Sequence, residues 1–211
     1  MKNQTIPIVA SIIAIFGFLS LVYIYTNKPS NVINAEVNQI KSTDRVKWSK
    51  NSKNILVEYS DFFCPACKIL HDYLKQYEST ESANFNISQK TAFVYRHFPI
   101  HDSSYDASYV AEAAGKQNKY YEMIDLIFAN QENLSNSKNL KDDLVKLALE
   151  LNIDIEKFKK DIDSQEVKDK VQEDQRSGEK AGINATPTFF LNGKKLEFQT
   201  TDDLQNLLQS S

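Results

Sequence analysis

The sequence predicts an α/β protein in which a sheet carries an inserted block of helices. Three observations support this fold class. A β-rich, mostly apolar segment at residues 54–60 is followed by a stretch with helical periodicity. A second such strand is separated from an Asn192-Gly193 turn by about eighty residues of helical pattern. An amphipathic segment then closes the chain. The order is therefore strand, helix, strand, helical block, hairpin and helix.

The start of the chain has the pattern of a membrane anchor. Residues 3–27 contain no charge, and the apolar run at 6–25 would span about 30 Å as a helix. Lys2 precedes it, which favours residues 1–5 inside the cytoplasmic membrane and the rest outside. We predict a single-pass anchor, or an uncleaved signal, at 6–25. A cleaved signal peptide is the alternative, although its apolar region is usually shorter, about 7 to 15 residues.

A domain at 44–211 is expected beyond a polar, unpatterned linker at 26–43. Its first half is predicted to contain an edge strand at 45–48, a buried strand at 54–60, a helix that starts at Cys64, and a second buried strand at 90–100. Pro65 suits the first turn of that helix, because its missing N–H would have no helical partner there.

The helical insertion is predicted at about 103–180. Its expected helices lie at 103–117, 119–131, 138–151, 154–162 and 164–180. A hairpin at 186–198 follows, and then a C-terminal helix capped by Thr200 or Thr201. The charges at 156–176 alternate in sign, which is typical of a solvated helical face.

Composition restricts the function. The formal net charge is −3, so nothing indicates a nucleic-acid partner. The chain has two cysteines, Cys64 and Cys67, two residues apart. A disulfide between them closes a very short loop and would stabilise little. A metal site needs about four ligands, and the chain offers these cysteines and at most His71. The pair is therefore best interpreted as redox-active.

Three separated segments resemble one known family. "VEYSDFFCPACK", "FVYRHFPI" and "GINATPTFFLNG" stand in the order found in the DsbA family of extracytoplasmic thiol–disulfide oxidoreductases. The sequence is most similar to the membrane-anchored, BdbD-like branch, from about Asp44 to the C-terminus. The resemblance implies a thioredoxin-like fold with an inserted helical subdomain. It implies neither a cofactor nor a metal.

The resemblance also assigns roles to the cysteines. Cys64 should lie at the N-terminus of a helix, where the free N–H groups and the helix dipole stabilise a thiolate. Cys67 should be the buried resolving partner. The dipeptide between them is Pro65-Ala66. Strongly oxidising relatives often carry histidine in place of Ala66, so the strength of oxidation stays open.

Further site residues are expected around this pair. Pro187 matches a cis-proline loop that pairs with substrate backbone, and Thr186 and Phe63 should border the sulfurs. An ordinary trans proline is the alternative. Glu58 matches a buried acid that accepts the proton of Cys67; the alternative is a strand-end glutamate that reaches water. His97 and His101 are expected to terminate the second strand as polar residues at a loop, and the resemblance assigns them no chemistry.

We therefore predict an enzyme that donates its disulfide to exported thiol-containing proteins. A quinone-linked membrane reoxidase, DsbB-like or VKOR-like, would restore it. Asn184-Ala185-Thr186 is a glycosylation acceptor at the proposed loop, which favours a bacterial periplasm or exterior. The alternatives are a reductase or isomerase, a metal-binding assembly factor that uses Cys64, Cys67 and His71, and a non-catalytic binding module.

Overall fold

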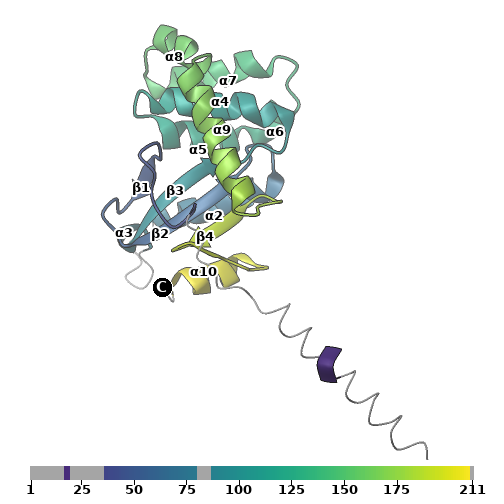
Figure 1. The fold of residues 1–211 in the computed structure, drawn as a ribbon. Coiled ribbons are helices and arrows are strands. Elements are labelled where there is room, and N and C mark those ends of the chain that lie inside the picture. The colour runs from purple at the N-terminus through teal and green to yellow at the C-terminus, as the bar shows by residue number, and fades with distance from the viewer. Residues whose placement is uncertain (1–16, 20–35, 80–86, 210–211) are drawn as a thin grey trace, which may run out of the picture. The chain divides into compact units, whose positions relative to one another are not determined.

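The computed structural model describes residues 17–19, 36–79 and 87–209 (Figure 1). The chain divides into two compact units, 1–32 and 33–211. Within the first unit, residues 17–19 are helical. The rest of the predicted anchor at 6–25, and the predicted inner segment at 1–5, lie outside the described residues. No helix in the described part of the chain is long and apolar enough to cross a membrane.

A five-stranded sheet forms the centre of the second unit, in the order β1-β3-β2-β4-β5. Its strands are β1 (Val46–Trp48), β2 (Asn54–Ser60), β3 (Thr91–His97), β4 (Thr188–Leu191) and β5 (Lys194–Lys195). β2 and β3 are parallel, and the other neighbours are antiparallel. The predicted strands and hairpin are confirmed.

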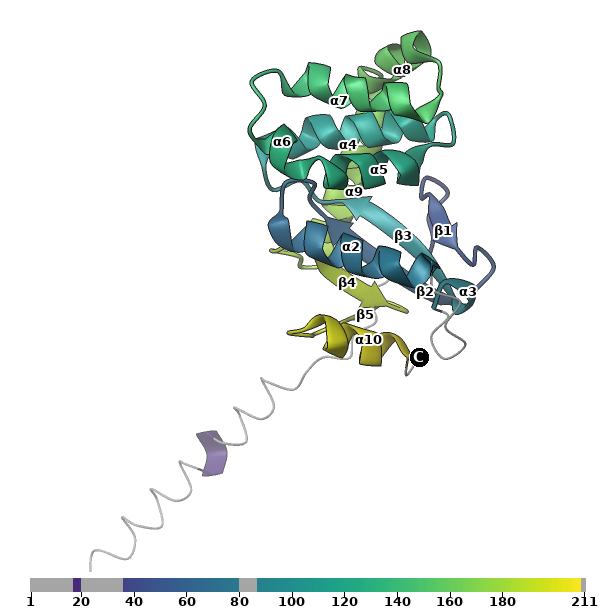
Figure 2. The same ribbon diagram turned by 180° about the vertical axis from the view of Figure 1, so that it is seen from behind.

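The two faces of the sheet pack against different elements. Leu56, Phe93 and Phe189 belong to the larger core, which also contains side chains of α2 (Pro65–Ser79) and α10 (Thr201–Gln209). Val57 and Phe190, one position along each strand, belong to the second core. Because side chains alternate along a strand, the mostly apolar sequence of β2 buries both faces. Figure 2 shows α2 crossing one face.

The helical insertion follows β3 and returns to β4. Its helices are α4 (Asp102–Gly115), α5 (Tyr120–Ala129), α6 (Gln131–Ser135), α7 (Leu140–Ala148), α8 (Ile155–Ile162) and α9 (Gln165–Lys180), with a 3-10 turn at Leu149–Leu151. Asp154 and Ser164 cap α8 and α9 through their side chains. The predicted insertion is confirmed. Two features were not predicted from the sequence: α3 (Ile87–Lys90) and the break between α5 and α6.

The predicted linker at 26–43 was wrong over residues 36–43, its described part, because these residues pack into the domain. Val37 is fully buried in the second core. The guanidinium of Arg96 donates to the carbonyls of Glu36 and Gln39, both at 3.0 Å. Residues 36–43 are therefore part of the domain. Their polar sequence concealed this because the main bonds use backbone carbonyls, which every residue has.

Two other predictions were wrong. His97 ends β3 as expected, but it is fully buried rather than a polar loop residue. The charges at 156–176 are not all solvated, because Lys170 and Asp174 of α9 are buried and form an ion pair. Lys170 also pairs with Asp44, and Asp174 also accepts a hydrogen bond from the backbone N–H of His97. His101 does lie in the loop, with half of its side chain exposed.

Candidate active site

The two cysteines lie at the start of α2, where β2 ends. Cys64 directly precedes the first helical residue, Pro65, and is half-buried. Cys67 is one turn further along and fully buried. Both are free thiols in this structure. An accessible sulfur thus lies at the helix N-terminus and a protected one lies beneath it.

The proline loop lies against the accessible sulfur. The Thr186–Pro187 peptide bond is cis, as the resemblance implied. The Cys64 thiol donates to the carbonyl oxygen of Thr186, with Sγ 3.3 Å from the oxygen. The loop immediately precedes β4, which pairs with β2, and this pairing brings residues 122 positions apart in the sequence into contact.

The surroundings shift the two thiols in opposite directions. The pKa of Cys64 is lowered from 9.0 to about 5, mainly because the Cys67 thiol donates a hydrogen bond to the thiolate. The N–H groups of Cys67 and Ala66 and the side chain of Thr186 add to this effect. Burial raises the pKa of Cys67 strongly, because a thiolate is poorly solvated there. These opposite shifts favour a thiolate at Cys64 and a protonated thiol at Cys67 at neutral pH.

Glu58 lies on β2, facing the α2 side of the sheet. Its exposed fraction is 1%, so the alternative of a glutamate that reaches water is wrong. Burial raises the pKa of its carboxyl to about 7, and the Cys64 thiolate adds to the shift. Its electrostatic contact with Cys67 also raises the pKa of that thiol. A carboxyl with this pKa can exchange protons at neutral pH.

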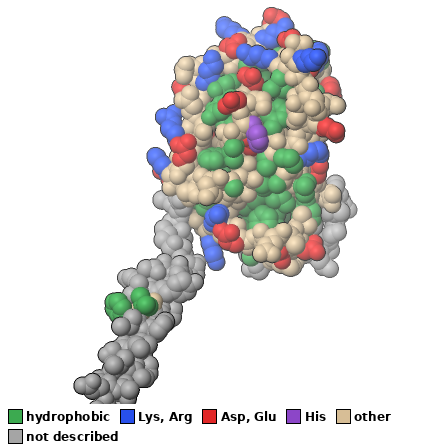
Figure 3. Space-filling view, turned by 90° about the vertical axis from the view of Figure 1, so that its right-hand side faces the viewer, with side chains coloured by type: hydrophobic (Ala, Val, Ile, Leu, Met, Phe, Trp, Pro, Cys, Tyr) green, Lys and Arg blue, Asp and Glu red, His purple; other side chains and the backbone are tan. Residues whose placement is uncertain are grey.

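An apolar groove of about 400 Å³ borders α2, the proline loop and the last helix. It is lined by Ala66, Ile69, Pro187, Leu196 and Phe198, among others. Ile69 is 62% exposed. Figure 3 shows hydrophobic side chains gathered over much of one face of the domain. Such a surface can hold apolar side chains of an extended chain.

The two phenylalanines before Cys64 differ in environment. Phe62 is fully buried and stacks on Tyr95, with 5.5 Å between the ring centroids. Phe63 is half-buried and packs against the edge of the core. Phe63 therefore remains the candidate for substrate contact, and Phe62 belongs to the core.

Asp61 organises the loop before Cys64, and the sequence analysis missed it. Its carboxylate accepts hydrogen bonds from the N–H of Phe63 at 2.7 Å, the N–H of Ile100 at 2.6 Å and the hydroxyl of Ser104 at 2.6 Å. Burial opposes ionisation, but these bonds hold its pKa below the usual value. A polar residue inside "YSDFFC" was the available signal.

Gln131 of α6 is a second residue that the sequence analysis missed. Its side-chain amide donates to the carbonyls of Phe62, at 2.8 Å, and Cys64, at 3.0 Å. The insertion therefore holds the first turn of α2 in place. No local pattern could have indicated this, because the partners are 67 and 69 residues away.

The predicted metal alternative gains no support from His71. Its ring stacks on Phe128, with centroids 4.6 Å apart, and Nε2 lies 3.0 Å from Asp125 Oδ1. Among the described residues, the group with metal-ligand spacing is instead His97, Glu112 and Asp174, whose ligand atoms lie within 4.8 Å of one another.

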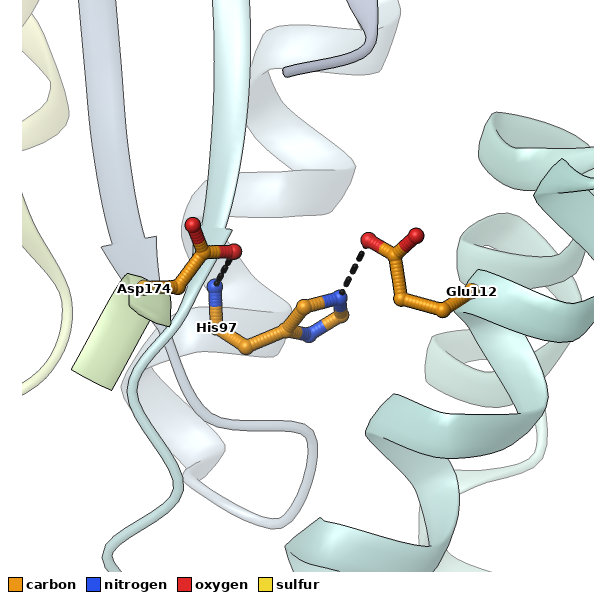
Figure 4. A group of neighbouring side chains, drawn as sticks. All are labelled: His97, Glu112 and Asp174. Atoms are coloured by element: carbon orange, nitrogen blue, oxygen red, sulfur yellow. Dashed lines mark hydrogen bonds and ion pairs between the residues drawn. The ribbon is translucent and has the colours of Figure 1, made fainter. Parts of the chain in front are cut away.

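Figure 4 shows that His97 lies between the two carboxylates: its backbone N–H donates to Asp174, and its ring contacts Glu112. The acids already have cationic partners. Lys170 pairs with Asp174, and Arg45 pairs with Glu112 at 2.8 Å. We interpret this group as a buried ion-pair network that joins the insertion to the sheet.

Comparison with known proteins agrees with this geometry. The family model described as Thioredoxin matches residues 41–210. The chain belongs to this family. The match covers more than half of the chain, including both cysteines and the proline loop.

Solved structures show the same thioredoxin-like fold with a helical insertion. Wolbachia pipientis alpha-DsbA1 has a TM-score of 0.70 at 21% identity, and covers 85% of this chain and 95% of its own. Oxidised BdbD from Bacillus subtilis has a TM-score of 0.65 at 21% identity, and the match covers 80% of this chain and 92% of BdbD.

A curated relative is "Na(+)/H(+) antiporter NhaA 1" of Mycobacterium sp. (strain KMS), 31% identical over 157 residues. The match covers 72% of this chain but 24% of the antiporter. The chain thus corresponds to about a quarter of that protein.

Proposed function

We propose that the protein is a thiol–disulfide oxidoreductase that acts outside the cytoplasm and donates the Cys64–Cys67 disulfide to exported proteins. The opposite pKa shifts of the two thiols carry this proposal. An accessible thiolate and a protected thiol are what disulfide exchange requires. The similar fold of MdbA, titled a thiol-disulfide oxidoreductase from Actinomyces oris, supports it at 16% identity and a TM-score of 0.60.

The proposed cycle begins with the oxidised pair. A substrate thiolate attacks Cys64, the bond to Cys67 breaks, and Cys67 leaves as a thiolate that takes a proton from Glu58. A second substrate thiolate then attacks the substrate sulfur of the mixed disulfide, and Cys64 leaves as a thiolate. Two electrons have passed from the substrate to the enzyme. The low pKa of Cys64 makes it the better leaving group in this last step.

Substrate would bind in extended form beside the proline loop. The backbone next to Pro187 can pair with a peptide, and Phe63 and the apolar groove can hold neighbouring side chains. Thr186 contacts the sulfur through its carbonyl oxygen. The recognition would depend mainly on backbone and apolar contacts, which suits unfolded exported proteins.

The electrostatics favour oxidation over reduction. A stabilised Cys64 thiolate stabilises the reduced enzyme, and a stabilised reduced form makes the disulfide a stronger oxidant. The second candidate is a reductase or isomerase, and the absence of a donor on Ala66 favours it. If the protein is an oxidant, we infer that a quinone-linked membrane reoxidase, DsbB-like or VKOR-like, restores its disulfide.

Residues 6–25 would attach the protein to the membrane, with the N-terminus inside.

The reduction potential distinguishes the two directions. Equilibration of the full chain with glutathione buffers should give a reduction potential of about −120 mV for an oxidant, as for DsbA. A potential of about −270 mV, as for thioredoxin, would reverse the proposed direction. Thiol trapping in the native cells supplies the matching test, since an oxidant is kept mostly as the disulfide. A Cys64→Ser variant should lose exchange completely.

A further inference from the structure

A small cavity lies beside Glu58 on the α2 side of the sheet. Its volume is about 10 Å³, roughly the space that one water molecule needs. Its lining includes Glu58, His71 and Tyr95. Glu58 Oε1 and the Tyr95 hydroxyl are buried and have no hydrogen-bond partner among the described residues. The cavity thus offers a water molecule polar partners as well as room.

His71 lies between this cavity and the surface. It follows Cys67 by one helical turn, lines the cavity, and has a side chain that is 13% exposed. Its Nε2 is 3.0 Å from Asp125 Oδ1, and Asp125 is 24% exposed. The stack on Phe128 fixes the ring. An imidazole is the side chain best suited to transfer protons near neutral pH.

The other charged groups around the cavity have partners. Lys47 of β1 pairs with Glu78 of α2 at 2.7 Å. Lys75 of α2 pairs with Asp125 of α5, also at 2.7 Å. The hydroxyl of Tyr121 donates to backbone carbonyls. Lysine, glutamate and tyrosine side chains ordinarily titrate away from neutral pH, whereas an imidazole titrates near it. Among the described groups facing the cavity, His71 is therefore the one placed to pass a proton on.

We propose that His71 transfers the proton between Glu58 and solvent, by way of a water molecule in this cavity. The proposal rests on the function proposed above. When Cys67 leaves as a thiolate, Glu58 gives up its proton to that sulfur. The Glu58 carboxylate then recovers a proton from protonated His71 through the water. His71 regains its proton from solvent through its partly exposed side chain. The reverse sequence removes a proton when the disulfide forms again.

A proton route through His71 is needed because Glu58 is buried. Glu58 is 1% exposed, so its carboxyl cannot exchange protons directly with bulk water. Each turn of the cycle nevertheless requires one proton to enter and one to leave. The transfer should therefore limit the rate when His71 is absent.

The test follows repeated turnover between about pH 6 and 8, with the full chain catalysing the reduction of a small synthetic disulfide by reduced glutathione. His71→Ala should slow the reaction about ten- to a hundredfold, at the lower end of the effect of a positioned proton-transfer group. Imidazole added to the buffer should restore much of the rate. The solvent deuterium isotope effect should increase. Glu122→Gln changes an exposed side chain of α5 that does not line the cavity, and as the control it should behave as wild type.

The outcomes separate this proposal from the proposed function. A wild-type chain that does not react with glutathione overturns the function itself. A reactive wild type with a His71→Ala variant that is equally fast, or slow without rescue by imidazole, overturns the route. Where His71→Ala does not fold, as judged by its melting temperature, His71→Gln decides through its rate and isotope effect. An unchanged rate and isotope effect in that variant also reject the route.

Discussion

At the residue scale, Cys64 owes its acidity to neutral donors rather than to a cation. Lys68, one position beyond Cys67, pairs with Asp72 on the exposed side of α2. Ala66 contributes its backbone N–H alone. The largest contribution comes from the thiol of Cys67. The CPAC sequence can therefore support a low pKa without the histidine of other relatives, because the second cysteine itself is the donor.

The first prediction follows from that donor. In the reduced wild type, the thiolate absorbance of Cys64 should titrate with a midpoint at about pH 5. Cys67→Ser keeps a hydrogen-bond donor and should change the midpoint little. Cys67→Ala removes the donor and should shift the midpoint upward, towards an ordinary thiol. A wild-type midpoint of about pH 8.5 would show that Cys64 is an ordinary thiol.

The second prediction concerns Glu58 and stability. Its pKa rises from 4.5 to about 7 on folding, so between these values the folded protein keeps a proton that the unfolded chain has lost. Stability from this group is therefore lost as the pH increases through that range. Glu58→Gln should raise the free energy of unfolding by up to about 3 kcal/mol at pH 8, and by little at pH 4.

Urea unfolding of the reduced proteins at several pH values measures this difference. Comparison of the variant with wild type removes most of the contribution from Cys64, which both contain. Glu122→Gln, an exposed glutamate, controls for the loss of charge alone. A difference between Glu58→Gln and wild type that does not grow with pH would show that Glu58 ionises normally.

At the element scale, α6 is short but holds the active-site loop in place. The third prediction is that Gln131→Leu lowers the free energy of unfolding by about 1–3 kcal/mol, because the carbonyls of Phe62 and Cys64 lose a buried donor. It should also slow exchange. Gln117→Leu is the control: Gln117 makes two backbone bonds to Asp154 on an exposed surface, where water can replace them.

The fourth prediction concerns the close approach of α9 to the sheet. A Cβ at Gly178 would lie 2.6 Å from a ring carbon of Phe98 and 3.1 Å from one of Tyr59. Alanine in place of glycine usually stabilises a helix by about 1 kcal/mol. Here we expect Gly178→Ala to destabilise the fold by about 1–3 kcal/mol, because the rings are buried and cannot move freely. Denaturant titration gives the sign directly.

At the scale of the whole molecule, the segment before β1 secures the sheet to the insertion. Asp44 forms a fully buried ion pair with Arg96, at 2.7 Å. Thr43 and Lys41 contact Glu173 of α9. Arg45 reaches Glu112 of α4. This segment therefore links β3, α4 and α9, although the sequence suggested a linker that ends at residue 43.

The fifth prediction tests that role by truncation. Deletion of residues 1–32 should leave the melting temperature of the remaining chain unchanged. Deletion of residues 1–43 should lower it by several degrees, because Val37 leaves the second core and Arg96 loses two carbonyl acceptors. Equal melting temperatures for the two truncated chains would show that the segment adds no stability.

The sequence predicted most of the regular structure because its signals are local. The strands at 54–60 and 188–191, the helix that begins after Cys64, and the hairpin at Asn192-Gly193 all follow from periodicity and turn chemistry. The short helix Ile87–Lys90 has only four residues, too few for a recognisable period.

By itself, the sequence determined the order of the elements and the position of both cysteines at a helix start, and the family resemblance added the proline loop as their companion. Tertiary structure alone decided the environment of the charged side chains. Glu58, His97 and Lys170 are buried because residues distant in sequence surround or pair with them, as Asp44 does with Lys170, and no local pattern encodes such partners. The physical reason is that desolvation and ion pairing depend on three-dimensional neighbours, whereas helices and strands depend largely on adjacent residues.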